Sequence, residues 1–460
     1  MRRLAVFALL PNAVFAVLSP FVFLQHPLVN VDYLVVWALA GWLSGAATGL
    51  LYGFCLLLDA LVSAEGIYEF STADALANAQ YLAQLDLGRV LAVAGLLLAC
   101  IAGLALLAVH VAGWRGGARA PRHVRIPAAI AAALLTVATP LSLLELWRHP
   151  LDPGTEPRFA GSRAVEVVES AAAAALGTRP VYAGAEWRGR TLLRDLAAVP
   201  AKAPPYNVVL VLVESDGLLR NERDEARVLA PLTGKEVARR YKVASGVQRF
   251  SGSTLAGELR ALCGLRGPAV DAETARALPP CLPKLLARRG FETLSFHGNS
   301  GRFFDRERWY PQLGFDLTYF AEQMQITARR PLAECGTLIH GICDLEFLGT
   351  LRRELAPAAP KQKFLYWLTL SSHLPVDEVL ARDSTLDCEE TASLPPDSPP
   401  CGLARILHTV HRRIAALALD PAIAPTRFIV VGDHAPVFPV RADRDLYDEA
   451  RVPFVDLVPL

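Results

Sequence analysis

The run Asn207-Val-Val-Leu-Val-Leu-Val213, followed directly by Glu214-Ser215-Asp216-Gly217, determines the fold class of this chain. A continuous aliphatic run of this kind is typical of a strand buried on both faces, as in a parallel sheet. Similar runs recur at residues 293–296, 364–370 and 427–431. Helical patterns lie between them, at residues 283–289 and 403–419. Strands that alternate with helices predict an α/β domain with a mostly parallel sheet between helices.

Long apolar segments fill the chain before residue 150. Four of them reach the roughly 20 apolar residues that a membrane-spanning helix needs; they are Leu4–Leu24, Tyr33–Leu58, Val90–Ala112 and Pro127–Trp147. Hydrophobic residues make up 53% of the whole chain, which also indicates a part in the bilayer. We therefore predict an α-helical bundle of four or five transmembrane spans over residues 1–148, a linker over 149–205, and a catalytic α/β domain over 206–460.

The loop between the third and fourth predicted spans contains four arginines, Arg115, Arg119, Arg122 and Arg125. Positive loops favour the cytoplasm, so the fourth span would carry the α/β domain to the periplasmic or extracellular side of a bacterial inner membrane. Arg2 and Arg3 also favour the cytoplasm, and four spans cannot satisfy both groups. Either the N-terminus lies outside, or the stretch 33–70 forms two short helices around Ser44–Gly49. The formal net charge of +1 gives no basic field that would attract nucleic acid.

Six of the eight cysteines fall in the predicted catalytic domain: Cys263, Cys281, Cys335, Cys343, Cys388 and Cys401. An even number outside the cytoplasm indicates disulfide bonds, although six cysteines leave several pairings open. The short separations favour Cys263–Cys281, Cys335–Cys343 and Cys388–Cys401. Zinc binding is the alternative, but the chain contains no CxxC pair.

Potential metal ligands follow the first and the last buried strand. Glu214 follows residues 207–213, and Asp433-His434 follows residues 427–431 after a glycine. Functional residues of α/β folds gather at the carboxyl ends of the strands, so we predict a divalent metal held by Glu214, Asp433 and His434. Carboxylate and imidazole without thiolate leave zinc, manganese and magnesium open. Ser215 and Asp216 would also suit a helix N-cap.

Hydroxyl and imidazole groups supply further candidates. Ser253 and Thr254 lead into an expected helix, whose N-terminus stabilises anions and where a metal would activate a hydroxyl as nucleophile; helix capping is the simpler alternative. His297 and His373 each follow a buried strand, where neutral imidazoles hold a phosphate or protonate a leaving oxygen. Three other histidines have no supporting context and are interpreted as surface or packing residues: His340, His408 and His411.

The motifs come in an order that resembles a known family over about residues 205–440. They are a strand ending in Glu-Ser, a Gly/Ser/Thr turn, FHGN, an aromatic-Arg-Tyr patch with LGFD, SSHxP and GDH. This set is similar to the lipoteichoic acid synthase-like, phosphoglycerol transferase branch of the alkaline phosphatase/sulfatase superfamily. The resemblance implies one divalent metal, most often manganese, bound by Glu214, the nucleophile Thr254, Asp433 and His434. It implies that the substrate phosphate contacts His297, Arg306 and His373.

The chain departs from that family at several positions. Thr254-Leu-Ala-Gly-Glu258 replaces the usual Thr-Ser-Asp-x-Glu, which leaves Ser253 as an alternative nucleophile. Phe304 stands where a tryptophan often precedes the arginine, and the Cys/Ser-x-Pro-x-Arg signature of formylglycine sulfatases is absent.

The resemblance also implies a function. It is a membrane-anchored transferase that moves phosphoglycerol or phosphoethanolamine from a phospholipid donor in the bilayer to a glycan or glycolipid acceptor, through a phospho-threonine intermediate. The alternatives are a phosphodiesterase or phosphatase with the same site, and a non-catalytic envelope scaffold. The scaffold would be favoured if Glu214, Asp433 and His434 did not converge in space.

Overall fold

The structure is a computed structural model. It describes residues 5–18, 21, 26–27, 29–40, 42–68, 87–111, 160–168, 182–198, 206–250, 252–267, 270–328, 330–357 and 361–460. The contacts between residues divide the chain into two compact units. The first comprises Met1–Ala79, Gly88–Arg179 and Pro439–Arg441, and the second comprises Gln80–Leu87, Pro180–Phe438 and Ala442–Leu460.

The first unit is mostly helical where the structure describes it. Its elements are the π-helical turn η1 (Ala5–Leu9), α2 (Leu10–Leu18), α3 (Asp32–Leu39), α4 (Gly45–Tyr68) and α6 (Leu87–Val111). Among the described residues, length and composition qualify one helix to cross a membrane, Gly45–Ser63. Two shorter apolar helices cover Val6–Leu18 and Ala94–His110. The bundle of four or five spans is therefore not confirmed, and its predicted fourth span, 127–147, lies outside the described residues.

The predicted second span is interrupted. Helix α3 ends at Leu39 and helix α4 begins at Gly45, with Ser44 Oγ accepting a hydrogen bond from Ala47 N at 3.2 Å. A serine in this position satisfies one of the free N–H groups at the start of a helix. The interruption agrees with the alternative in which the stretch 33–70 forms two helices.

The beginning of the predicted linker packs within the first unit. Strand β1 (Val29–Asn30) pairs in parallel with β2 (Ala160–Gly161). Asp59, buried inside α4, accepts hydrogen bonds from Arg163 Nε at 3.2 Å and from the Tyr33 hydroxyl at 2.8 Å. Removal of either partner would leave a buried carboxylate less well satisfied, so this cluster stabilises the attachment of residues 160–168 to the unit.

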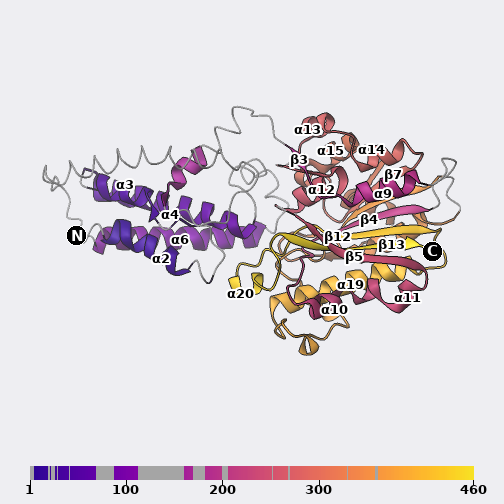
Figure 1. Ribbon diagram of the computed structural model, residues 1–460. Helices are drawn as coiled ribbons and strands as arrows, with labels where there is room; N and C mark the ends of the chain where they lie inside the picture. The colour runs from indigo at the N-terminus through magenta and orange to yellow at the C-terminus, as the bar shows by residue number, and fades with distance from the viewer. Residues whose placement is uncertain are drawn as a thin grey trace. The chain divides into compact units, whose positions relative to one another are not determined.

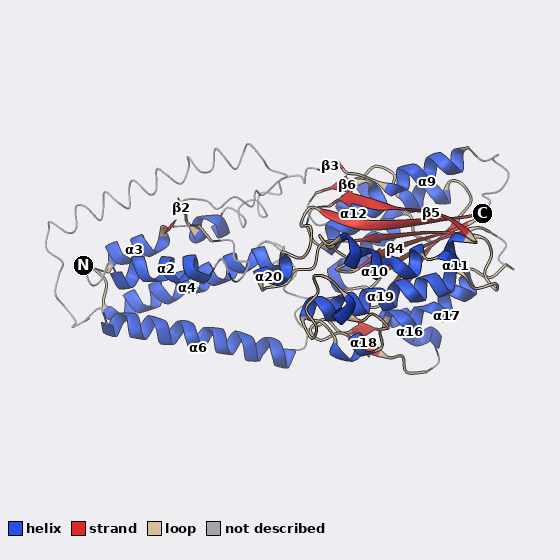
Figure 2. Ribbon diagram, turned by 60° about the horizontal axis from the view of Figure 1, so that its bottom comes forward, coloured by secondary structure: helices blue, strands red, loops and turns tan. Residues whose placement is uncertain are grey.

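The second unit contains a seven-stranded mixed sheet (Figures 1 and 2). Its order is β5 (Tyr241–Arg249), β13 (Arg451–Pro459), β12 (Thr426–Gly432), β4 (Asn207–Val213), β11 (Lys363–Leu368), β7 (Glu292–His297) and β8 (Leu317–Tyr319). Strands β12, β4, β11, β7 and β8 are parallel to one another. At one edge of the sheet, β13 runs antiparallel to both of its neighbours, β12 and β5. The predicted α/β class is confirmed, and the antiparallel edge adds to it.

Helices cover both faces of this sheet. Figure 1 shows α12, α13 and α14 on one side and α10, α11 and α19 on the other. Because both faces are covered, every residue of β4, β11 and β12 is buried, which explains the continuous aliphatic runs in the sequence. The α-helices described after residue 180 are α9 (Arg188–Ala197), α10 (Glu222–Thr233), α11 (Lys235–Ala238), α12 (Thr254–Cys263), α13 (Ala272–Ala277), α14 (Leu282–Ala287), α15 (Arg306–Leu313), α16 (Ala321–Ala328), α17 (Asp344–Glu354), α18 (Glu378–Arg382), α19 (Pro399–Ala418) and α20 (Arg441–Arg444).

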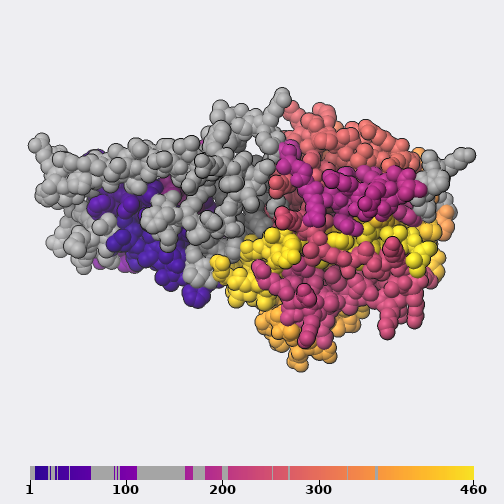
Figure 3. All heavy atoms as spheres, viewed as in Figure 1, coloured from indigo at the N-terminus to yellow at the C-terminus, as the bar shows by residue number. Residues whose placement is uncertain are grey.

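The end of the predicted linker packs against the second unit. Figure 3 shows α9, in magenta, beside the yellow C-terminal strand β13. Arg188 Nη2 lies 3.1 Å from Asp456 Oδ2, and Trp187 Nε1 donates to Ala261 O at 2.9 Å. Residues 187–197 therefore belong to the α/β layer structure, while the exact bounds of the linker stay a prediction.

The three predicted disulfides are all present: Cys263–Cys281, Cys335–Cys343 and Cys388–Cys401. The bonds close segments of 18, 8 and 13 residues, so each stabilises a local loop rather than linking distant elements. Cys55 and Cys100 are free thiols.

Alkylation of the denatured, unreduced protein should therefore label Cys55 and Cys100 alone, because the other six sulfurs carry no thiol. Peptide mass mapping of the unreduced digest should recover the three local pairs. Labelling of any of the six before reduction, or a peptide that links two different pairs, would contradict this arrangement.

Candidate metal centre

The three predicted metal ligands meet at the carboxyl edge of the sheet. Glu214 follows β4, and Asp433-His434 follows β12, the neighbouring parallel strand, in which Gly432 stands opposite Val213. One ligand atom from each of Glu214, Asp433 and His434 lies within 4.8 Å of the others, and all three residues are buried. A bound metal requires such a convergence of ligands, whereas a non-catalytic scaffold does not require it.

The two carboxylates lie together around the His434 ring, whose Nε2 is 3.4 Å from Glu214 Oε1 and 3.2 Å from Asp433 Oδ2. Asp433 Oδ1 accepts hydrogen bonds from the backbone N–H of Ser215 and of His434, at 2.8 and 2.6 Å. The other oxygen, Oδ2, is buried and makes no hydrogen bond among the described residues, although His434 Nε2 lies 3.2 Å from it. Burial and the charge of Glu214 raise the pKa of Asp433 well above its usual range.

The pKa of Glu214 is shifted in the opposite direction. Burial disfavours its charged form, but the hydrogen bond with His434 and the nearby His373 and His434 rings outweigh burial and lower the pKa of this carboxyl. A cation between Glu214 and Asp433 would allow both to ionise. This set of two carboxylates and one imidazole, with one carboxylate oxygen that makes no hydrogen bond among the described residues, fits a divalent metal such as zinc, manganese or magnesium.

Thr254 places its hydroxyl against these ligands. It is the first residue of α12, and its Oγ1 donates to Glu214 Oε2 at 3.0 Å and lies 3.2 Å from His434 Nε2. Ser253 is the N-cap residue of the same helix and makes no capping hydrogen bond through its side chain. The geometry therefore favours Thr254 over Ser253 as the hydroxyl that a metal would activate, and the N-terminus of α12 adds a favourable dipole.

The residues after Glu214 support the centre instead of capping a helix. Helix α10 begins at Glu222, and its N-cap is Asn221, so the N-cap interpretation of Ser215 and Asp216 is wrong. Ser215 Oγ donates to Glu214 Oε1 at 3.0 Å. Asp216 Oδ2 lies 3.2 Å from Nε2 of the buried His411, whose pKa this carboxylate raises against the opposing effect of burial. His411 thus has a specific buried partner in Asp216, which lies two residues after the predicted metal ligand Glu214.

The two strand-end histidines lie near Glu214 but differ in their environment. His297 is buried, and its Nδ1 hydrogen-bonds to Leu368 O at 3.1 Å. A carbonyl only accepts, so Nδ1 carries the proton and Nε2 is an acceptor in the neutral ring. Burial and, secondly, the Arg306 charge lower the pKa of His297 to about 3, so the ring is neutral at physiological pH. His373 is half-buried, and its Nδ1 lies 2.6 Å from Leu374 O.

Arg306 is buried against a carboxylate that we did not predict. Its Nε and Nη2 lie 3.1 and 2.9 Å from Glu258 Oε2, and Tyr310 Oη donates to Glu258 Oε1. A third N–H, on Nη1, faces Phe303 O at 3.5 Å. A guanidinium has five N–H donors, so two stay available for a phosphoryl oxygen. The only sequence signal for Glu258 is its place at the end of the Thr254-to-Glu258 motif.

Asp344 is a second residue that the sequence did not single out for a role. Its carboxylate accepts the backbone N–H groups of Leu370 and Ser371, at 3.0 and 2.7 Å, and its own N–H donates to Ser371 Oγ at 3.1 Å. These bonds fix the loop that leads to His373. Burial raises the pKa of Asp344 to about 6, but the backbone hydrogen bonds oppose this shift.

Comparison with protein families agrees with this geometry. Residues 257–448 match the model of the sulfatase family. This part of the chain is therefore similar to the sulfatase family. The match includes His297, Arg306 and His373 together with Asp433 and His434, whereas the β4 end and the start of α12 precede it. A comparison with curated proteins found no match.

A comparison with solved structures found several matches at low sequence identity, three of which follow. The lipoteichoic acid synthase LtaP from Listeria monocytogenes has 16% identity and a TM-score of 0.40 over 58% of this chain and 71% of that chain. The phosphoglycerol transferase GacH from Streptococcus pyogenes, in complex with sn-glycerol-1-phosphate, has 16% identity and a TM-score of 0.40 over 58% of this chain and 72% of that chain. The C-terminal periplasmic domain of EcEptC from Escherichia coli, in complex with zinc, has 15% identity and a TM-score of 0.38 over 56% of this chain and 74% of that chain.

Replacement of Asp433 by asparagine should greatly reduce metal-dependent stabilisation without harming the metal-free fold. Asparagine keeps an oxygen for the Ser215 and His434 N–H groups and removes the charge next to Glu214. Wild type at a hundredfold excess of Mn²⁺ over its Kd should gain about 2.7 kcal/mol, a Tm increase of several degrees.

Thermal unfolding with and without Mn²⁺, in the presence of a chelator as reference, measures both effects. Asp433→Asn should have a metal-free Tm at or above that of wild type and a much smaller response to Mn²⁺. An equal response to Mn²⁺ in the variant would remove Asp433 from the metal site.

Proposed function

We propose that this chain is a membrane-anchored, metal-dependent phosphotransferase that moves phosphoglycerol or phosphoethanolamine from a phospholipid to a sugar-containing acceptor. The observation that carries the proposal is the place of the Thr254 hydroxyl, within hydrogen-bond distance of Glu214 and His434 in a buried cluster of metal ligands. The similarity to the sulfatase family supports the same class of chemistry.

The donor set defines what a bound metal would do. Glu214, Thr254, Asp433 and His434 would hold one divalent ion, with Mn²⁺ as the first candidate and Mg²⁺ or Zn²⁺ as alternatives. When bound, it would lower the pKa of the Thr254 hydroxyl and stabilise negative charge on the phosphoryl oxygens.

In the first step, Thr254 Oγ1 forms a bond to the lipid phosphorus, and the bond from phosphorus to the diacylglycerol oxygen breaks. The hydroxyl proton leaves to solvent, and the half-buried His373, with both ring nitrogens protonated, donates a proton from Nε2 to the leaving diacylglycerol oxygen. The two free N–H donors of Arg306 hold the phosphoryl oxygens. His297, whose Nε2 accepts, binds a hydroxyl or ammonium of the head group rather than an anionic oxygen.

In the second step, a hydroxyl of the acceptor attacks phosphorus, and the bond from phosphorus to Thr254 Oγ1 breaks. His373, which lost its proton in the first step, takes the acceptor proton, and Thr254 Oγ1 takes a proton back from solvent, so the enzyme returns to its starting state. A hydrolase would use the same residues with water as the acceptor. The two functions therefore differ in the acceptor and not in the first step.

A lipid donor is consistent with the rest of the chain. The helix Gly45–Ser63 is long and apolar enough to anchor the protein in a membrane. Three disulfides favour the periplasmic or extracellular side for the catalytic domain, as does the arginine-rich loop before the predicted fourth span.

The test is mass spectrometry of the protein incubated with Mn²⁺ and phosphatidylglycerol or phosphatidylethanolamine. Wild type should carry a phosphoglycerol or phosphoethanolamine adduct on Thr254, and Thr254→Ala should lose both the adduct and at least about a thousandfold of diacylglycerol release. Ser253→Ala is the matched control, since its hydroxyl is adjacent, and it should keep both. An adduct that persists in Thr254→Ala and disappears in Ser253→Ala would assign the nucleophile to Ser253 and contradict the proposal.

A further inference from the structure

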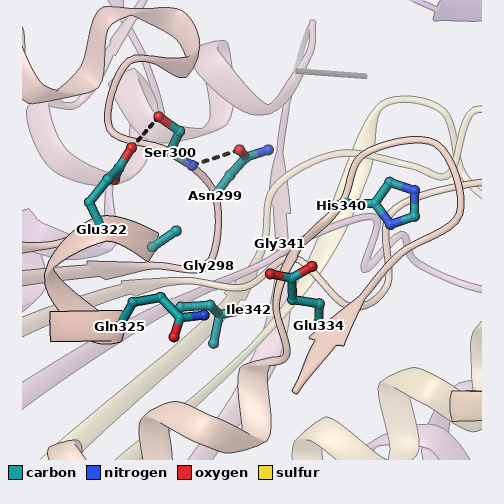
Figure 4. A pocket seen from close by; sticks show the side chains of 10 residues that line it. Gly298, Asn299, Ser300, Glu322, Gln325, Glu334, His340, Gly341 and Ile342 are labelled. Atoms are coloured by element: carbon teal, nitrogen blue, oxygen red, sulfur yellow. Dashed lines mark hydrogen bonds between the residues drawn. The ribbon is translucent and has the colours of Figure 1, made fainter. Parts of the chain in front are cut away.

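A cavity of about 330 Å³ lies beside the carboxyl end of β7, directly after His297 (Figure 4). Helix α16 forms one wall, and the hairpin of β9 (Glu334–Cys335) and β10 (Gly341–Ile342) forms the other. None of the four proposed metal ligands lines it. In the sheet, β7 is separated from β4 by β11 alone, and neighbouring strands lie about 4.8 Å apart. The end of β7 thus lies roughly 10 Å from the end of β4 that carries Glu214.

The floor of the cavity is made of backbone. Ile342 N donates to Gly298 O at 2.8 Å. A Cβ atom on Gly298 would lie 2.3 Å from Ile342 O, and one on Gly341 would lie 2.5 Å from Gly298 O, so only glycine permits this approach at either position. The Cys335–Cys343 disulfide joins β9 to the residue directly after β10. The hairpin is therefore held against the end of β7, and the cavity has a fixed floor.

The walls carry polar groups that are ready for a ligand. On one side, Glu322 is oriented by hydrogen bonds from Ser300 Oγ at 2.5 Å and Gly301 N at 3.2 Å. Figure 4 shows Glu322 and Gln325 on that side and Glu334 and His340 on the other. Within the described part of the chain, the side chains of Gln325, Glu334 and His340 make no hydrogen bond or ion pair. Both walls thus offer unpaired donors and acceptors.

The lining excludes two classes of ligand. It contains two carboxylates and neither lysine nor arginine, so it would repel the phosphate of the lipid donor. Among the described residues, the only cluster with metal-ligand spacing is that of Glu214, Asp433 and His434, so the cavity carboxylates are not arranged for a second ion.

We propose that this cavity binds a sugar or polyol unit of the acceptor. Carboxylate, carboxamide and imidazole groups accept and donate hydrogen bonds to hydroxyls, and the volume is at the lower end of the range for small-molecule sites, which suits a single ring. The cavity lies beside the end of β7, which is roughly 10 Å from the end of β4, so a ring bound in it would be the neighbour of the unit whose hydroxyl attacks phosphorus. The acceptor is then at least a disaccharide, and the cavity orients it. This inference rests on the proposed transferase function.

The test uses the full-length protein in detergent with Mn²⁺ and phosphatidylglycerol, and maltose, cellobiose and chitobiose as acceptors. Two products are measured by mass spectrometry: phosphoglycerol transferred to the sugar and phosphoglycerol released to water. Gln325→Trp fills the cavity from an exposed helical position, and Glu334→Ala removes an exposed hydrogen-bonding wall residue, so neither should disturb folding. Ile326→Trp is the matched control, because Ile326 is the next residue on α16, is 80% exposed and does not line the cavity.

We expect the ratio of sugar transfer to water hydrolysis to fall at least about tenfold in Gln325→Trp and Glu334→Ala, through a higher KM for the sugar. Ile326→Trp should keep the wild-type ratio, and glucose should be a poorer acceptor than the best disaccharide. An unchanged ratio in both cavity variants, or transfer to none of the sugars while diacylglycerol is still released, would overturn the cavity assignment. Absence of diacylglycerol release from wild type would instead overturn the proposed function, and the present inference with it.

Discussion

The structure of the site depends on the forced proximity of two buried carboxylates, Glu214 and Asp433. Each ends one of two neighbouring parallel strands, so the register of β4 and β12 brings them together whatever their side chains prefer. Two buried like charges at this distance are unfavourable, and the neutral form of one or a bound cation relieves the conflict. The oxygen of Asp433 that has no hydrogen-bond partner within the described residues indicates the cation. A divalent cation bound by both carboxylates would remove this repulsion.

The surroundings of the two carboxylates keep them in place. Arg260, fully buried on α12, donates from Nη2 to the backbone oxygens of Gly432 and Asp433 at 2.8 and 2.9 Å. Burial lowers the pKa of Arg260 to about 10, so it stays charged at neutral pH and offsets part of the negative charge of the site. The same helix begins at Thr254, so one element both stabilises the end of β12 and carries the proposed nucleophile. Below them, the pair of Asp216 and His411 anchors the β4 exit to α19.

Local patterns were sufficient to predict the central part of the fold and of the site. The aliphatic runs at β4, β7, β11 and β12 are unambiguous because both faces of these strands are buried. Strand β13 was missed because Pro453 and Asp456 interrupt its apolar pattern, and proline argues against a strand inside a sheet. The short separations of the cysteines were enough to give the disulfide pairs. The membrane region was harder, since an apolar segment predicts burial or a bilayer but does not show where helices break, as between α3 and α4.

The residues that support the site could not be predicted, because their partners are distant in the sequence. Glu258 meets Arg306 across 48 residues, and His411 meets Asp216 across 195. No periodicity or local motif reports such contacts; only the folded sheet brings them together. For the same reason, His340 was interpreted as a surface or packing residue, and its place in the cavity beside β7 became visible only with the β9–β10 hairpin.

The most direct measurement of the central claim is a manganese anomalous difference map from crystals of the protein grown with Mn²⁺. We expect one strong peak at bonding distance, about 2.0–2.2 Å, from oxygens of Glu214 and Asp433, from His434 Nε2 and from Thr254 Oγ1. A peak that contacts other residues instead would contradict the claim. So would the absence of any peak between Glu214 and Asp433 in crystals grown with excess Mn²⁺.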